Sequence, residues 1–150
     1  MRIDVAAEAD VEVIAQMLGE IEEYYGGENI PGDREQVRAA LVGPSPAATV
    51  LLARDDDGRV LGLASYSRLW PAAGADTSLY LKELFVREPF RKSGVGRRLM
   101  EAVQAAGVTA GCTRLEWTAD TDNPAAVAFY AALGAHRNEG KVMYRAALKR

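Results

Sequence analysis

The residues whose types and spacing are best suited to binding or catalysis lie between Leu84 and Leu99. The sequence there reads LFVREPFRKSGVGRRL. An apolar run typical of a strand is followed by a short segment with Gly94 and Gly96, and then by a helical pattern. The first turn of a helix has backbone amides without intrahelical partners and carries roughly half a positive charge. Glycine lets a phosphate approach such amides closely, so this segment is typical of an anion site.

Basic side chains add to the positive charge of this segment. They are Arg87, Arg91, Lys92, Arg97 and Arg98. The segment has no Gly-Lys-Ser/Thr step and no set of three spaced glycines, so it fits neither a Walker loop nor a dinucleotide-binding turn. The alternative to a phosphate site is an ordinary strand-to-helix turn whose arginines are solvated.

A second segment suited to binding or catalysis runs from Asn123 to Ala135. Asn123 and Pro124 predict the start of a helix, and Gly134 predicts its end. Tyr130 lies on this helix with Ala126 four residues before it, so the two side chains can share a face. The alternative is that Tyr130 is a core aromatic residue whose hydroxyl binds a carbonyl.

Composition limits the other kinds of chemistry. The chain has 150 residues, 49% of them hydrophobic, which suits one globular domain over residues 1–150. Cys112 and His136 are the single cysteine and histidine, so a disulfide within the chain is excluded and a metal site is not expected. No apolar run reaches the roughly 20 residues of a membrane span, so we expect a cytoplasmic protein without a membrane partner.

Charge is distributed unevenly along the chain. The formal net charge is −3, and acidic residues far outnumber basic ones in residues 1–40. The basic residues of the 87–98 segment therefore form one local spot on an acidic protein. This distribution argues against a nucleic-acid partner and favours a local anion site.

Hydrophobic periodicity and turn signals predict the elements that must position these segments. We expect a mixed α/β (α+β) domain with a central, mostly antiparallel sheet flanked by helices. Asp10 is expected to cap the first helix and Asp33 the second. The expected strands span Arg2–Ala6, Thr49–Arg54, Val60–Leu69, Leu79–Val86, Arg114–Thr118 and Lys141–Leu148.

Taken together, the two segments resemble the GNAT superfamily of N-acetyltransferases. The Arg/Gln-x-x-Gly-x-Gly/Ala hallmark is matched by Arg91 to Gly96, and the Asn-to-Tyr helix by Asn123 to Tyr130. The resemblance implies the GNAT fold, with a sheet that splays at the cofactor cleft, and acetyl-CoA as cofactor. It implies transfer of an acetyl group to a primary amine by direct attack within a ternary complex.

The resemblance also implies roles for individual residues. Tyr130 would be the general acid that protonates the leaving thiolate, and Asn123 and Ala126 would lie beside the pantetheine arm. The residues expected to bind the rest of the cofactor are Leu84, Phe85, Val86, Arg91, Lys92, Ser93, Gly94, Val95, Gly96 and Arg97.

The reaction also needs a base, because a primary amine has a pKa of about 10 and is almost entirely protonated at neutral pH. A carboxylate can take that proton directly or through water. Glu83 is the candidate, since it lies on the strand that would hold the thioester, and Glu116 is the second choice. The alternative is that Glu83 is a surface residue paired with an arginine.

Within the superfamily, the sequence from Leu79 to Val86 is most similar to the spermidine/spermine (diamine) N-acetyltransferases. Lys82 is a departure, because those enzymes carry a glutamate there, and a lysine facing the cleft would repel a polycation. The acceptor amine is expected to contact Tyr24, Tyr25, Trp70, Lys82 and Glu83. Glu20, Glu22 and Glu23 add an acidic rim suited to a cationic amine, or else form a solvated helix end.

Several functions stay open on these grounds. The favoured partner is a small-molecule amine. The alternatives are acetylation of a protein N-terminus or lysine, a CoA-binding module without turnover, and a nucleotide-binding loop. Members of the superfamily often dimerise, so a homodimer is one expectation for this chain.

Overall fold

The computed structural model describes residues 1–149, which divide into two compact units. The first unit spans Met1–Thr118 and the second begins at Ala119. The single domain expected over residues 1–150 stays a prediction.

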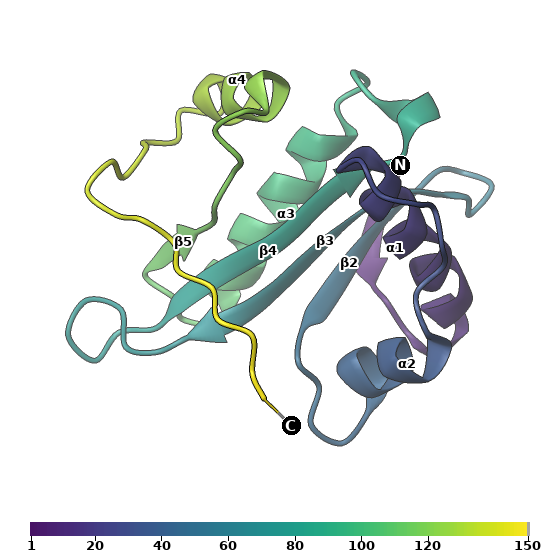
Figure 1. Cartoon of the computed structure of the whole chain (residues 1–150), viewed down its shortest axis with the longest axis horizontal. Coiled ribbons are helices and arrows are strands. Elements are labelled where there is room, and N and C mark those ends of the chain that lie inside the picture. Colours follow the sequence, from purple (N-terminus) through teal and green to yellow (C-terminus); the bar gives the residue numbers. More distant parts are fainter. Residues whose placement is uncertain (150) are drawn as a thin grey trace. The chain divides into compact units, whose positions relative to one another are not determined.

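A five-stranded sheet forms the centre of the first unit (Figure 1), with the strand order β1-β2-β3-β4-β5. The first four strands are antiparallel to their neighbours, whereas β5 runs parallel to β4. This mixed sheet confirms the predicted fold class. The strands are β1 (Arg2–Val5), β2 (Thr49–Arg54), β3 (Val60–Leu69), β4 (Ser78–Val86) and β5 (Arg114–Glu116).

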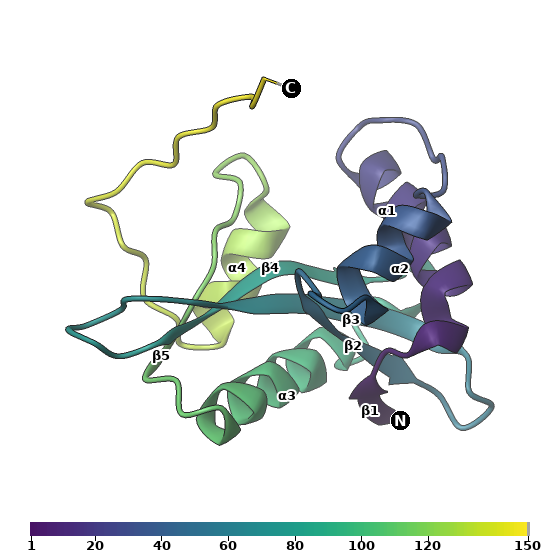
Figure 2. The same cartoon turned by 90° about the horizontal axis from the view of Figure 1, so that it is seen from below.

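Helices cover both faces of this sheet, as Figure 2 shows. The helices α1 (Val11–Tyr24) and α2 (Arg34–Val42) lie on one face, and α3 (Val95–Thr109) lies on the other. Each helix buries an apolar stripe at helical spacing. Met17 of α1 and Leu99 of α3 are both completely buried. β4 lies between these two packed layers, and the glycine segment follows this strand.

One of the two predicted helix caps is formed and the other, at the start of α1, is not. Asp33 caps α2 as expected, accepting a hydrogen bond from the Gln36 amide at 2.9 Å. Asp10 precedes α1 but makes no side-chain cap bond to it. Its carboxylate accepts the Ala7 amide proton at 2.9 Å and pairs with Arg54 at 2.9 Å. A guanidinium from the neighbouring strand is the stronger partner for this carboxylate, so the cap prediction for Asp10 is wrong.

Two irregularities of β4 shape the region where the chemistry was expected. Ser65 pairs with Glu83 and Tyr66 with Leu81, so Lys82 is the extra residue of a β-bulge. On its other edge, β4 pairs with β5 only from Ser78 to Tyr80. β5 also ends there, at Glu116, whereas β4 continues to Val86. This arrangement agrees with the splay that the resemblance implies.

The second unit contains the helix α4 (Pro124–Ala132) and irregular chain after it. The strand predicted over Lys141–Leu148 is not formed, and the residues of this segment are exposed. A strand is stable only beside a neighbour that takes up its backbone hydrogen bonds. Residues 119–149 contain no other strand to serve as that neighbour, so the alternating pattern alone does not produce one.

A network around Arg54 ties β1 and the start of α1 to β2. Its guanidinium lies 2.9 Å from carboxylate oxygens of both Asp4 and Asp10, and its side chain is only 14% exposed. Burial opposes ionisation of Asp4, but hydrogen bonds and charges from Arg2 and Arg54 outweigh it. They hold the pKa of the Asp4 carboxyl below its usual value.

We expect Arg54→Met to lower the free energy of unfolding by about 2 kcal/mol at neutral pH, because Asp10 would lose its charged partner. Asp4 contributes stability above its unfolded pKa of about 3.9, and this is lost as the pH falls through its lower folded pKa. The difference between the two proteins should therefore shrink in acid. Urea unfolding at neutral and acidic pH measures it. Arg2→Met removes an exposed pair and is the control; equal effects of both variants would contradict the prediction.

Candidate functional site

The chain leaves β4 through a short turn before it enters α3. The Arg87 amide donates to the Leu61 carbonyl at 2.9 Å, and residues Glu88–Phe90 then form one turn of 3-10 helix. Lys92 and Gly94 both have positive φ, 60° and 87°. The left-handed conformation at Gly94 ends the turn and begins α3 directly after it.

The first turn of α3 presents the backbone groups that an anion needs. The Arg98 amide donates to the Gly94 carbonyl at 3.1 Å and is the first i-to-i−4 bond of this helix. The amides of Val95, Gly96 and Arg97 precede that bond, so helix geometry provides them with no carbonyl partner. A Cβ at Gly94 would meet no atom within 4 Å, so the space beside it is open. The observed backbone therefore fits a phosphate group.

The basic side chains of this segment divide into two sets. Lys92, Arg97 and Arg98 are exposed near the first turn of α3. Arg87 and Arg91 instead contact α1: Arg87 pairs with Glu20, and the Arg91 guanidinium lies over the ring of Tyr24 at 4.9 Å. The sequence predicts one basic spot made of all five residues, whereas the structure divides them between these two sets.

The end of α1 brings two of the predicted acceptor residues to β4. The Tyr24 ring lies 6.2 Å from the ring of Phe85 and 5.1 Å from that of Tyr25, both edge-on. Glu83 is two residues before Phe85 on the same strand, so its side chain points to the same face of the sheet. The structure thus places Tyr24, Tyr25 and Glu83 in one region of the first unit.

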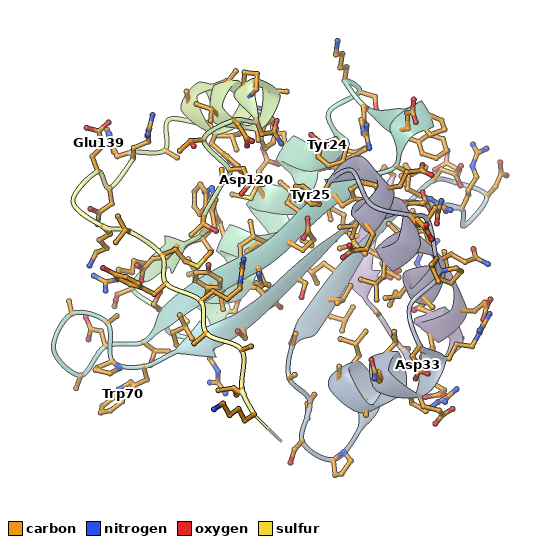
Figure 3. The ribbon with its side chains drawn as sticks, viewed as in Figure 1. Tyr24, Tyr25, Asp33, Trp70, Asp120 and Glu139 are labelled. Atoms are coloured by element: carbon orange, nitrogen blue, oxygen red, sulfur yellow. The ribbon has the colours of Figure 1, made fainter. Side chains whose placement is uncertain are left out.

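Two other predicted acceptor residues are placed differently. Trp70 follows β3 and is 69% exposed, and its indole donates to the Ala75 carbonyl at 2.8 Å. Figure 3 shows Trp70 at the opposite end of the β3–β4 hairpin from Tyr24 and Tyr25. Lys82 is exposed in the bulge of β4, one residue from Glu83. The structure therefore does not bring Trp70 together with the other acceptor candidates.

The predicted residues Asn123, Ala126 and Tyr130 belong to the second unit. Asn123 caps α4, accepting the Ala126 amide proton at 3.1 Å. The Tyr130 ring contacts that of Phe129 at 5.3 Å between centroids. Gly134 has φ of 81° and its amide donates to the Ala131 carbonyl, which ends the helix as predicted.

The second choice for the base has structural partners in the first unit. Glu116 accepts hydrogen bonds from the Ser78 hydroxyl at 2.7 Å and from Arg114 Nε at 2.9 Å. These bonds link β5 to β4 at the point where the two strands still pair. Glu116 therefore stabilises the start of the splay.

Comparison with known proteins agrees with this fold. The acetyltransferase (GNAT) family profile matches residues 14–135. The chain belongs to this family, as the resemblance predicted. Among the described residues 1–149, no helix is both long and apolar enough to cross a bilayer.

Two curated relatives are named as acetyltransferases of amines. An L-ornithine N5-acetyltransferase of Arabidopsis thaliana is 34% identical over 80 residues, which are 53% of this chain and 35% of that protein. An aminoglycoside N(6')-acetyltransferase type 1 of Salmonella typhimurium is 33% identical over 92 residues, which are 59% of this chain and 63% of that protein. The chain thus spans less than two thirds of the length of these relatives.

A solved structure covers much more of the chain. An integron cassette protein from the mobile metagenome of V. cholerae is 29% identical, with a TM-score of 0.83, and the match covers 97% of this chain and 91% of that one. This similarity supports the fold over almost the whole sequence. The narrower similarity to the diamine branch stays a prediction.

Proposed function

We propose that the protein is an acetyl-CoA-dependent N-acetyltransferase that acts on the primary amine of a small molecule. One observation carries the proposal: a short turn joins β4, the strand whose pairing with β5 stops at Tyr80, to the open first turn of α3. This arrangement offers a phosphate site and an adjoining strand end in one stretch of chain. The printed names of the two curated relatives, an ornithine and an aminoglycoside acetyltransferase, support an amine as the acceptor.

The backbone of the glycine segment fits the pyrophosphate of acetyl-CoA. We assign the amides from Lys92 to Arg97 to the phosphates, with Lys92, Arg97 and Arg98 supplying positive charge nearby. The strand end from Leu84 to Val86 would hold the pantetheine arm by backbone pairing, as an added strand does. When bound, acetyl-CoA supplies an acetyl group activated as a thioester.

Two side chains are assigned to proton transfer. Glu83 would take a proton from the ammonium form of the acceptor, which makes the nitrogen lone pair available for attack on the acetyl carbonyl. Tyr130 would give its phenolic proton to the sulfur as the carbon–sulfur bond breaks. Backbone amides of β4 are suited to stabilise the negative charge that develops on the carbonyl oxygen.

We expect Glu83→Gln to lower kcat/KM about 100-fold at neutral pH, since general-base catalysis typically contributes about that much. The loss should shrink as the pH approaches the amine pKa of about 10, because the acceptor then deprotonates without help. A pH–rate profile of both proteins measures this. Glu116→Gln is the matched control, and a loss of the same size at every pH would exclude Glu83 as the base.

The acceptor region favours a cationic small molecule. Glu22 and Glu23 are exposed at the end of α1, beside Tyr24 and Tyr25. Glu20 is already paired with Arg87, so it is the least suited of the three glutamates to bind an acceptor. Lys82 would select against a long polycation and in favour of an amine that also carries a negative group. The cytoplasmic location and the homodimer expected from the sequence stay predictions.

The test of this function is release of free thiol from acetyl-CoA in the presence of different amines. The panel contains polyamines, diamines, ornithine and lysine analogues, aminoglycosides and short peptides. Turnover with one class of small amine would support the proposal, and turnover with peptides alone would favour protein acetylation. Binding of CoA without turnover on any amine would favour a CoA-binding module.

A further inference from the structure

The segment that follows β4 is joined to α1 by an ion pair between residues far apart in the sequence. Arg87 donates from Nε to Glu20 Oε1 at 3.0 Å and from Nη2 to Glu20 Oε2 at 2.9 Å. Both side chains are about three-quarters buried, with 23% and 25% exposure. Arg87 also donates to the Val60 carbonyl at 3.3 Å. This two-pronged geometry fixes the orientation of both groups better than a single contact does.

A second contact joins the same two segments four residues further along each. The Arg91 guanidinium carbon lies 4.9 Å from the centroid of the Tyr24 ring and 5.4 Å from that of Phe85. Arg91 Nε also donates to the Val86 carbonyl at 2.8 Å. Residues four apart share one face of a helix, so Glu20 and Tyr24 present a single face of α1 to the two arginines. The C-terminal end of α1 is thus held at two points.

We propose that Arg87 and Arg91 are positioning residues that couple the glycine segment to the acceptor side of the site. Phosphates bound at the first turn of α3 would order the turn between β4 and α3. Because Arg87 and Arg91 lie in this turn and contact α1, the end of α1 would be stabilised as well. Tyr24 and Tyr25 would then be held more firmly against β4 when the cofactor is in place. This inference rests on the proposed function.

The geometry favours this role for Arg91 over direct contact with a phosphate. Its guanidinium already lies against two aromatic rings and donates to a backbone carbonyl. The charge available to phosphates comes from Lys92, Arg97 and Arg98, which are exposed beside the open amides. Phosphate contact by Arg91, as the sequence predicted, is the competing outcome of the test.

The first experiment compares two variants with a control that alters a different ion pair of α1. Arg91→Lys keeps the charge but loses the planar stack, and Glu20→Gln removes the charge that holds Arg87. Each should raise the KM for the amine about 10-fold at saturating acetyl-CoA, a typical coupling between two sites, while the Kd for acetyl-CoA measured without amine stays unchanged. Arg34→Lys alters the exposed pair of Arg34 with Glu12 on α1 and should change neither constant.

The second experiment measures amide hydrogen exchange in a peptide containing residues 20–25. Acetyl-CoA should slow exchange there in the original protein, and this protection should be lost in Arg91→Lys and in Glu20→Gln. A weaker Kd for acetyl-CoA in Arg91→Lys would make Arg91 a phosphate ligand and overturn the inference. Protection unaffected by acetyl-CoA would also overturn it. Failure of the unmodified protein to bind acetyl-CoA would instead overturn the proposed function.

Discussion

Tyr130→Phe is expected to lower kcat by about 100-fold or more, the usual contribution of a positioned general acid. Phenylalanine keeps the ring that contacts Phe129 at 5.3 Å but has no proton to give to the sulfur. The helix around it is capped by Asn123 and closed at Gly134, so the substitution leaves the fold of α4 intact. Steady-state turnover and calorimetric titration with acetyl-CoA measure the two constants separately.

The matched control for this prediction is Tyr144→Phe in the same unit. Tyr144 is 90% exposed, and loss of its hydroxyl should leave kcat unchanged. The prediction requires the Kd for acetyl-CoA to stay unchanged in Tyr130→Phe. If kcat and affinity instead fell together, Tyr130 would be a packing residue and the general acid would lie elsewhere.

Gly94→Val is expected to abolish binding of acetyl-CoA. The residue has φ of 87°, which a β-branched side chain strongly disfavours, and its side chain would occupy the open space beside the first turn of α3. If the phosphates lose two charge-assisted hydrogen bonds from the backbone amides of this segment, binding weakens by about 3 kcal/mol. This corresponds to more than about 100-fold in Kd. Calorimetric titration with acetyl-CoA measures the change.

Two further variants separate the loss of binding from backbone strain. Gly58 has φ of 81° in the β2–β3 turn, and a Cβ at this position would likewise meet no atom within 4 Å. Gly58→Val therefore imposes similar strain away from the glycine segment, and it should bind acetyl-CoA normally. Gly94→Ala tests a smaller side chain at the site itself. Normal binding by folded Gly94→Val would place the phosphate site elsewhere.

The segments with strong local signals were predictable from the sequence. The apolar run that became β4 and the glycines before α3 define the strand, the turn and the helix within a few residues of their observed bounds. Asn123 with Pro124 likewise predicted the start of α4. These signals are local because each depends on propensity, capping or left-handed backbone within one turn of chain.

The features that depend on distant partners were not predictable. Asp10 has the right spacing for a helix cap, but Arg54, far along the chain, takes its carboxylate. The sequence places Glu20 in an acidic rim, but its carboxylate pairs with Arg87, 67 residues further along the chain. The pattern of Lys141–Leu148 suits a strand, yet the second unit offers it no neighbour. In each case the missing information was whether a distant partner is present and which residue it is.

The measurement that bears most directly on the proposed function is a crystal structure of the protein with acetyl-CoA. We expect the pyrophosphate oxygens to lie within hydrogen-bond distance of the amides between Lys92 and Arg97, with the acetyl group beside β4 near Glu83. We also expect the Tyr130 hydroxyl to lie within hydrogen-bond distance of the sulfur. A cofactor whose phosphates bind away from the first turn of α3, or a Tyr130 hydroxyl directed away from the sulfur, would contradict this assignment.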